Sequence, residues 1–273
     1  MMAEVTRFRK RFLSIRGSSV AINGGIGIVL VLYALFAMTC VYYRGDIEPI
    51  VLIGIFVGLM LFAIPLLLHA SISGERERRT WDMLLVAPIT HGQIIVGKFM
   101  GAFAGLAMAF GLYLIPVLID AAFHADARFI NVLLASVTVM AQGASLIAMT
   151  ILISSRVKRP LVALAVSIGV VMLYFFFVPG LVSTMSTFTG DFVTGLVNPF
   201  AVLIRLAQNT HNIPPDEFRS SGSAFQSLDV YTLAFSHLLY QVIITVVLLA
   251  WATRTLVYAD HEVKFISKKK RHA

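Results

Sequence analysis

Few residues in this chain are of a type and spacing that could do chemistry, and none of them forms a complete catalytic set. Residues 92–98 have the spacing of a phosphate-binding loop, but Phe99 follows where a serine or threonine would hold magnesium. His124 and Asp126 could contact a metal, yet zinc sites usually have at least three protein ligands, so we expect a solvated pair. The sequence contains no His-Glu-x-x-His or Gly-x-Ser-x-Gly motif. We therefore predict no catalytic residue, no metal site and no cofactor in this chain.

The composition indicates what kind of element would position any functional residue. Of the 273 residues, 58% are hydrophobic and only 13% are charged, whereas a soluble domain carries charge on roughly a quarter of its residues. Such a chain has too little polar surface to meet water on all sides, so its solvent must be largely lipid. The basic residues that give the chain its net charge of +8 lie between apolar runs rather than on one face of a soluble domain. This pattern favours a membrane surface over a nucleic acid as the partner.

Six charge-free apolar runs are long enough to cross a bilayer, which takes about 20 residues. Unpaired backbone groups are costly in hydrocarbon, so each run is predicted to be a helix. The fold class is therefore an all-α integral membrane protein with six transmembrane helices, forming a single transmembrane domain over residues 1–273. The predicted spans are 18–43, 49–73, 94–119, 129–154, 160–187 and 230–255.

The lysine and arginine residues predict how these spans are oriented. Of 22 such residues, five precede the first span, four follow the second, three follow the fourth and six lie at the C-terminal end. The other side holds Arg44, Arg128, Arg205 and Arg219. Basic residues favour cytoplasmic loops. We therefore predict a multi-pass protein of the cell (inner) membrane with both termini in the cytoplasm.

Two segments outside the spans are predicted to lie at the membrane surface or to enter it partway. In residues 4–16, apolar positions recur every three or four residues among basic ones, which predicts an interfacial amphipathic helix. The outer loop 187–229 contains an apolar run that is too short to span and is interrupted by Pro199, which predicts a re-entrant segment or an interfacial helix. The remainder of this loop, with Pro214 and Pro215, is expected to be irregular.

The segment 75–87 joins the second and third spans on the predicted cytoplasmic side. It can form a short charged helix, which Pro88 ends because proline disfavours α geometry in the residue before it. Thr90 and Gln93 have the spacing of a capping box, so a new helix is predicted to begin there and run into the third span. Such a helix could transmit force from a soluble partner or could simply be a solvated loop helix, and its residues alone leave both interpretations open.

This segment resembles the stretch after the second span of ABC-2-type permeases, the membrane subunits of a large class of ABC exporters. The matching positions are Glu75, Glu77, Thr80, Asp82, Leu84, Leu85, Pro88, Ile89, Thr90, Ile95, Gly97 and Lys98. The chain departs from the family pattern at Arg79, where glycine is common, and at Trp81, where an aliphatic residue is common. A weaker similarity concerns a family segment between the fifth and sixth spans. It is carried by Asn198, Pro199, Phe200 and Arg205.

The resemblance implies the ABC-2, or type V exporter-like, fold and a permease subunit without catalytic residues. Such a subunit would pair with a second permease subunit and bind two ABC ATPase subunits, which would carry the ATP and magnesium. Segment 75–87 would be the coupling helix that docks on the ATPase. The residues implied to make this contact are Glu75, Arg76, Glu77, Arg79, Thr80, Trp81, Asp82, Leu84 and Leu85. ATP-driven closure of the ATPases would then switch the spans between inward- and outward-facing states.

Small residues recur at four-residue spacing on two of the spans. They are Gly97, Gly101 and Gly105 on the third span and Gly54 and Gly58 on the second. Such stripes let helices approach closely, and they could serve either a dimer interface or packing within one subunit. Asp120 lies at the outer end of its apolar run, where interfacial exposure is expected.

Two other functional classes are alternatives to an ATP-driven exporter. A secondary transporter or channel would need no ATPase, but ion-coupled carriers hold ionisable residues near the bilayer midplane, where we expect essentially none. A membrane-embedded enzyme or assembly factor would need a catalytic motif, which the sequence lacks. The uncharged spans suggest that the substrate is a lipid, a lipid-linked molecule or an amphipathic compound.

Overall fold

The computed structural model describes residues 49–78, 90–123, 128–178, 181, 193–210 and 229–271. These residues are helical apart from short connections, and five of their helices are long and apolar enough to cross a membrane. The five correspond to the second to sixth predicted spans. The predicted first span, 18–43, and the interfacial helix, 4–16, lie outside the described residues, so the number of six spans stays a prediction.

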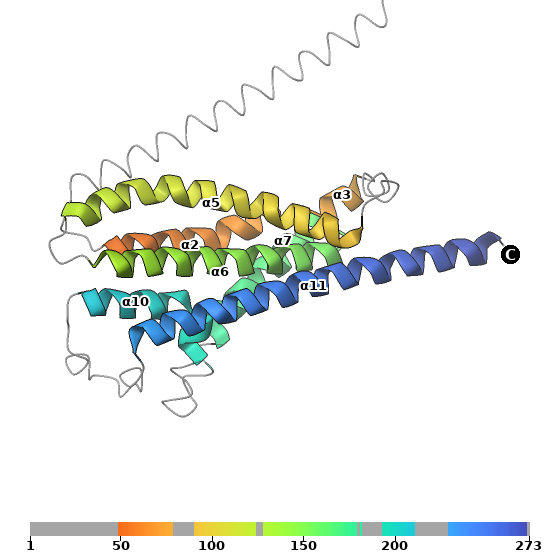
Figure 1. Cartoon of the computed structure of the whole chain (residues 1–273). Helices are drawn as coiled ribbons and strands as arrows, with labels where there is room; N and C mark the ends of the chain where they lie inside the picture. The colour runs from red at the N-terminus through yellow and green to blue at the C-terminus, as the bar shows by residue number, and fades with distance from the viewer. Residues whose placement is uncertain are drawn as a thin grey trace, which may run out of the picture.

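The described helices are arranged as one elongated bundle (Figure 1). In chain order they are α2 (Pro49–Leu68), α3 (Ser73–Glu77), α5 (His91–Phe123), α6 (Phe129–Arg156), α7 (Pro160–Met172), the π-helical turn η1 (Leu173–Phe177), α10 (Pro199–Thr210) and α11 (Val230–Arg271). Consecutive spans alternate in direction, as Figure 1 shows. Consequently α3, the α6–α7 connection and the end of α11 lie at one end of the bundle, and the end of α5, the start of α6 and α10 lie toward the other.

Helix α6 forms the centre of the bundle. Over the most apolar 18 residues of α6, 61% are buried, against 22% for the same length of α5 and 28% for that of α11. It contacts α2, α5, α7, α10 and α11, and its apolar side chains Leu146, Ile147 and Ile151 are fully buried. Because protein surrounds α6 on most sides, its polar side chains can face other helices instead of lipid.

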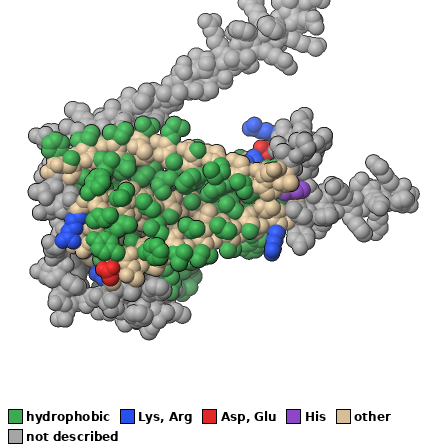
Figure 2. Space-filling view, in the orientation of Figure 1, with side chains coloured by type: hydrophobic (Ala, Val, Ile, Leu, Met, Phe, Trp, Pro, Cys, Tyr) green, Lys and Arg blue, Asp and Glu red, His purple; other side chains and the backbone are tan. Residues whose placement is uncertain are grey.

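The outer surface of the bundle is apolar over its middle. Figure 2 shows a continuous band of hydrophobic side chains, with charged side chains confined to the two ends of the visible face. Large exposed side chains such as Leu67, Met108 and Leu161 contribute to this surface. A band of this kind suits contact with hydrocarbon, which bears out the prediction of a multi-pass membrane protein.

Helix α10 is 12 residues long, about half of what a bilayer requires. It packs against α2, α6 and α11, and its side chains Val202, Leu203 and Leu206 are buried. A Cβ added to Gly54 on α2 would lie 3.8 Å from Leu203 Cδ1, which is ordinary van der Waals contact. Helix α10 is therefore too short to be a span, and its re-entry into the membrane stays a prediction.

Several helix boundaries differ from the predicted spans. Helix α2 ends at Leu68, and the chain turns before α3, so the apolar run to residue 73 is not one helix. Helix α11 continues to Arg271, about 16 residues beyond the predicted end at residue 255. The sequence after Arg254 contains no glycine or proline that would end the helix, and hydropathy locates only the part of a helix that lies in lipid.

Candidate functional site

The first candidate site is the α3 junction, defined here as α3 and the side chains of α5 and α6 that hold it. The Ser154 hydroxyl of α6 accepts hydrogen bonds from the backbone N–H groups of Ile72 (3.0 Å) and Ser73 (3.1 Å). It donates to the carbonyl of His69 at 2.8 Å. The first N–H groups of a helix have no partner within that helix, and the N-cap residue Ile72 has no polar side chain. Ser154 therefore caps α3 from a different helix.

Charged side chains complete the α3 junction. Lys98 of α5 forms an ion pair with Glu75 Oε1 at 2.6 Å and donates to the Ser71 carbonyl at 2.7 Å. Arg76 donates to the Ser155 carbonyl of α6 at 2.7 Å. Glu75 and Arg76 therefore have partners within the chain, and α3 is attached to both α5 and α6.

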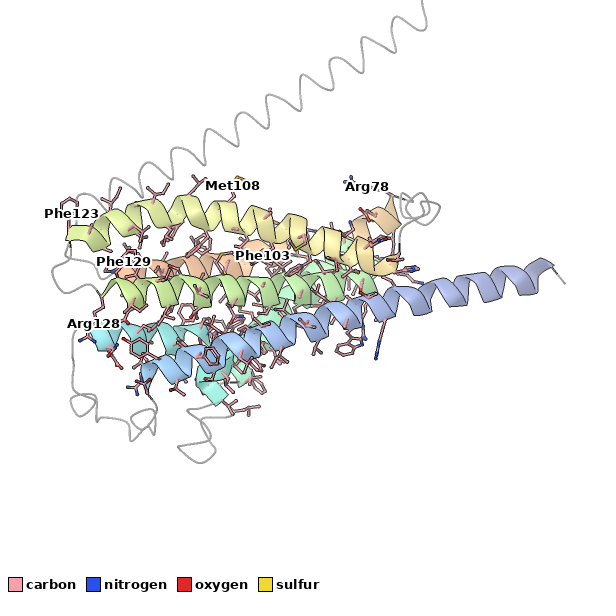
Figure 3. All side chains as sticks on the ribbon, viewed as in Figure 1. Arg78, Phe103, Met108, Phe123, Arg128 and Phe129 are labelled. Atoms are coloured by element: carbon pink, nitrogen blue, oxygen red, sulfur yellow. The ribbon has the colours of Figure 1, made fainter. Side chains whose placement is uncertain are left out.

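The next two side chains of this segment are directed outward. Glu77 and Arg78 are exposed, and Figure 3 shows Arg78 pointing away from the bundle at the end of α3. The remaining predicted coupling residues lie outside the described residues. They are Arg79, Thr80, Trp81, Asp82, Leu84 and Leu85. The coupling role of segment 75–87 stays a prediction.

The predicted capping box at the start of α5 is present. The backbone N–H of Thr90 donates to Gln93 Oε1 at 2.8 Å, and the backbone N–H of Gln93 donates to Thr90 Oγ1 at 3.3 Å. Residues 92–98 lie in the first turns of α5. They therefore form a helix rather than a phosphate-binding loop.

A second polar site begins at a break in the backbone before α10, where the short helix 193–197 ends. Pro199 has no N–H, so the carbonyl of Gly195, four residues earlier, has no helical donor. The N–H of Phe200 donates to Asn198 Oδ1 at 3.0 Å, so it does not serve the carbonyl of Leu196. The Asn-Pro sequence therefore leaves two adjacent carbonyls in need of donors from elsewhere.

Helix α11 supplies these donors. His237 Nδ1 lies 3.0 Å from the Gly195 carbonyl oxygen, and Gln241 Nε2 lies 3.5 Å from that of Leu196. Gln241 Nε2 also donates to Gln142 Oε1 of α6 at 2.8 Å. His237 and Gln241 are four residues apart on one helix face. They join the segment before α10 to the centre of the bundle.

The amide of Gln142 has a defined orientation. The Ser145 hydroxyl donates its hydrogen to the Gln142 backbone carbonyl at 2.8 Å, so its oxygen must accept from Gln142 Nε2 at 3.2 Å. Gln142 Oε1 therefore faces Gln241. We call Gln142, Ser145, His237, Gln241 and the carbonyls of Gly195 and Leu196 the midspan network, because Gln142 lies halfway along the 28-residue helix α6.

One expectation from the sequence is wrong, and it concerns a carboxyl group on α5. Asp120 was expected to be exposed, but its side chain is only 1% exposed. The reason is that Asp120 shares a face of α5 with Val117 and Ala121, which are buried in the bundle.

The residues of the Asn-Pro segment lie close together but have different environments. Asn198 caps α10, Pro199 is buried, Phe200 packs against the core and Arg205 is half-buried. Asn131 of α6 also donates to the Leu206 carbonyl at 3.2 Å. The segment is therefore held by α6 at its outer part and by α11 at its break.

The predicted small-residue stripes have few neighbours among the described residues. A Cβ added to Gly58, Gly97, Gly101 or Gly105 would have no neighbouring atom within 4 Å, and only Gly54 faces another described helix. The glycine face of α5 therefore points away from the described bundle. Within this part of the chain, the stripe on α5 does not mediate packing.

Sequence reasoning missed Ser154, Gln142, His237 and Gln241. The sequence did contain a pattern that indicates His237 and Gln241, because two polar side chains four residues apart in an apolar span lie on one helix face, and that face is expected to point inward. Ser154 gave no such signal, since nothing local identifies a cap supplied by another helix.

Comparison with known proteins places most of this structure in one family. Residues 38–262 match the family described as ABC-2 family transporter protein. The match extends from before α2 into α11 and so includes the α3 junction and the midspan network. No curated protein matches the chain.

Proposed function

The chain belongs to the ABC-2 family of transporter proteins, and from this premise we propose that it is the permease subunit of an ATP-binding-cassette exporter. A separate ATPase subunit, expected in two copies, would bind ATP and magnesium and drive it. A second permease subunit would complete the transporter. The substrate would be a lipid, a lipid-linked molecule or an amphipathic compound, moved across the membrane or between its leaflets.

The observation that carries this proposal is the attachment of α3. A segment that receives force from an ATPase must be fixed to the spans it moves. Lys98 attaches α3 to α5, while Ser154 and Arg76 attach it to α6. A displacement of α3 would therefore act on two spans directly, and the exposed Glu77 and Arg78 provide charges for a complementary partner surface.

The end of α6 also contacts α11. Ser155 Oγ lies 3.1 Å from Thr255 Oγ1, and the Arg156 guanidinium lies 4.4 Å from the centre of the Trp251 ring. Helix α6 contacts α11 again at Gln142 and Gln241. In this proposal, movement of α3 passes through α6 to α11 and to the segment before α10.

The apolar exterior supports an apolar or amphipathic substrate. The buried polar side chains of α6, such as Thr138 and Gln142, face the interior, whereas the exposed middle of the bundle is hydrophobic. An inorganic ion would find few groups on this surface to replace its hydration shell. Transport measurements that show tight selectivity for an inorganic ion would contradict this part of the proposal.

Co-purification tests the ATPase partnership. We would isolate the protein in mild detergent from its native cell and compare wild type with Arg78→Glu, which reverses an exposed charge without breaking the internal pair of Glu75. Arg159→Glu is the matched control, because Arg159 is also exposed and lies in the α6–α7 connection. We expect a soluble ATPase with wild type and control and less of it with Arg78→Glu. Folded wild-type protein that retains no ATPase would contradict the proposal.

Ser154→Ala tests whether α3 transmits force. Removing the cap leaves two backbone N–H groups of the α3 junction without their acceptor, so α3 should loosen from α6 at a cost of about 1 kcal/mol. We expect the ATPase to bind nearly as before while substrate no longer stimulates ATP hydrolysis. Ser136→Ala is the control, since the Ser136 hydroxyl bonds only within its own helix, to the Val132 carbonyl. Equal stimulation in both variants would exclude Ser154 from coupling.

A further inference from the structure

Two fully buried polar atoms of the midspan network have no hydrogen-bond partner among the described residues. They are Nε2 of His237 and Oε1 of Gln241. Both side chains are 0% exposed. An unpaired polar group in such surroundings costs free energy, so what pairs with these atoms is a physical question about the site.

His237 Nε2 must be a hydrogen-bond acceptor. Its other ring nitrogen, Nδ1, lies 3.0 Å from the Gly195 carbonyl, which can only accept, so Nδ1 carries the hydrogen. A second hydrogen would make the ring cationic, and a charge on a fully buried side chain within a membrane span is costly. The partners described around this ring are neutral. The imidazole is therefore neutral and presents a lone pair at Nε2.

Gln241 Oε1 is an acceptor for a similar reason. The amide nitrogen of Gln241 faces two acceptor oxygens, Gln142 Oε1 and the carbonyl oxygen of Leu196. These contacts fix the orientation of the amide, so Gln241 Oε1 points away from both of them. Tyr174, which interacts with Gln241, uses its hydroxyl hydrogen for Tyr240 at 3.0 Å. Neither unpaired atom can therefore satisfy the other, because both need a donor.

We propose that His237 and Gln241 form a buried water site, in which bound water donates a hydrogen bond to each of the two acceptor atoms. The two side chains are four residues apart on one face of α11, so both acceptors belong to the same buried part of the helix surface. Buried waters in proteins typically pair such otherwise unsatisfied groups. The ligand class is set by the chemistry, which demands two donated hydrogens and no charge.

The bound water would give the break before α10 a different character from the rest of the bundle. His237 and Gln241 use one polar edge to hold the carbonyls of Gly195 and Leu196 and the other to hold the water. The contact between the segment before α10 and α11 would therefore consist of hydrogen bonds to backbone carbonyls on one side and to water on the other.

X-ray radiolysis footprinting of the purified protein in lipid nanodiscs tests the site, because radicals formed from a bound water label the side chains beside it. Leu233 and Leu256 are both 1% exposed on α11, and only Leu233 lies one turn from His237. We expect Leu233 to be labelled and Leu256 to stay unlabelled. In His237→Asn, whose shorter side chain keeps a donor for Gly195 but has no atom at the position of Nε2, the labelling of Leu233 should be lost.

Gln241→Met should cause the same loss, while Ser167→Ala, which removes a buried hydroxyl on α7, should leave the labelling unchanged. If the variants do not fold, the difference in labelling between Leu233 and Leu256 of the wild-type protein still tests the proposal. Equal labelling of Leu233 and Leu256 in folded wild-type protein would overturn the proposal. A high-resolution density map in which a protein group bonds directly to His237 Nε2 would overturn it as well.

Discussion

The α3 junction and the midspan network both join α6 to its neighbours, yet they use different chemistry. The α3 junction contains an ion pair, Lys98 with Glu75, and the guanidinium of Arg76. The midspan network contains only amides, a hydroxyl, an imidazole and backbone carbonyls. The first lies at an end of the bundle, where water can support a charge, and the second lies halfway along the spans, where a charge is costly.

This difference suggests that each junction suits its depth. Partly exposed charges respond to ionic strength and to a charged partner, which is the property that the proposed function requires of the α3 junction. Neutral hydrogen bonds shielded from water do not respond in this way. In the proposed function, the midspan network would therefore keep the helices in register while a partner acts on the α3 junction.

The largest expected effect comes from placing a charge in the midspan network. Gln241→Glu would put a carboxylate near the middle of the bilayer, at a cost of about 3 kcal/mol, and would remove the donor to Gln142. We expect a clear loss of folded protein, measured by SDS titration of the purified protein. Gln93→Glu makes the same change at the exposed start of α5, where glutamate also completes a capping box. If Gln241→Glu and Gln93→Glu lost similar amounts of folded protein, the position of the charge along the spans would not account for the different chemistry of the two junctions.

A smaller effect is expected from breaking the charged junction. Lys98→Ala would leave the half-buried Glu75 without its ion pair, at a cost of about 1–2 kcal/mol. The difference in stability between wild type and Lys98→Ala should also shrink as salt is added, because the ion pair is partly exposed. SDS titration at low and high ionic strength measures both. Lys98→Arg keeps the charge and should lose less. An effect of Lys98→Ala that is independent of salt would contradict the assignment of an ion pair.

The smallest effect is expected outside both junctions, on the glycine face of α5. Gly101→Ala adds a methyl group where no described atom lies within 4 Å, so helix propensity alone should raise stability by up to about 1 kcal/mol. The melting temperature of the single subunit measures this. A loss of stability, or a change in the assembly size of the permease, would instead show that another helix covers this face.

Sequence reasoning located the spans from α2 to α11 and the start of α5, because hydropathy and local capping are encoded in neighbouring residues. It also identified the Asn-Pro interruption before α10. It could not predict that Asp120 is buried, that Ser154 caps α3 or that His237 holds the Gly195 carbonyl. Each of these depends on which face of one helix meets another helix, and a uniformly apolar span carries little information about its own rotation.

The α3 segment illustrates the same limit from the functional side. The resemblance to the family implies that Glu75, Arg76 and Glu77 contact the ATPase, and of these three Glu75 and Arg76 also bond within the chain, whereas Glu77 is exposed. A motif shows which residues belong together in sequence, whereas the side chains of adjacent helical residues diverge by about 100°. Half of such a motif can therefore hold the segment in place while the other half is free to meet a partner.

The length of α11 has a mechanical consequence. At about 1.5 Å per residue, its 42 residues form a rod of about 63 Å, twice the roughly 30 Å of a hydrocarbon core. If the rod pivots at Gln241, which lies 11 residues after its first residue and 30 before its last, the two arms are unequal. The far tip then travels nearly three times as far as the near one, so a small rotation within the bilayer becomes a large sweep beyond it.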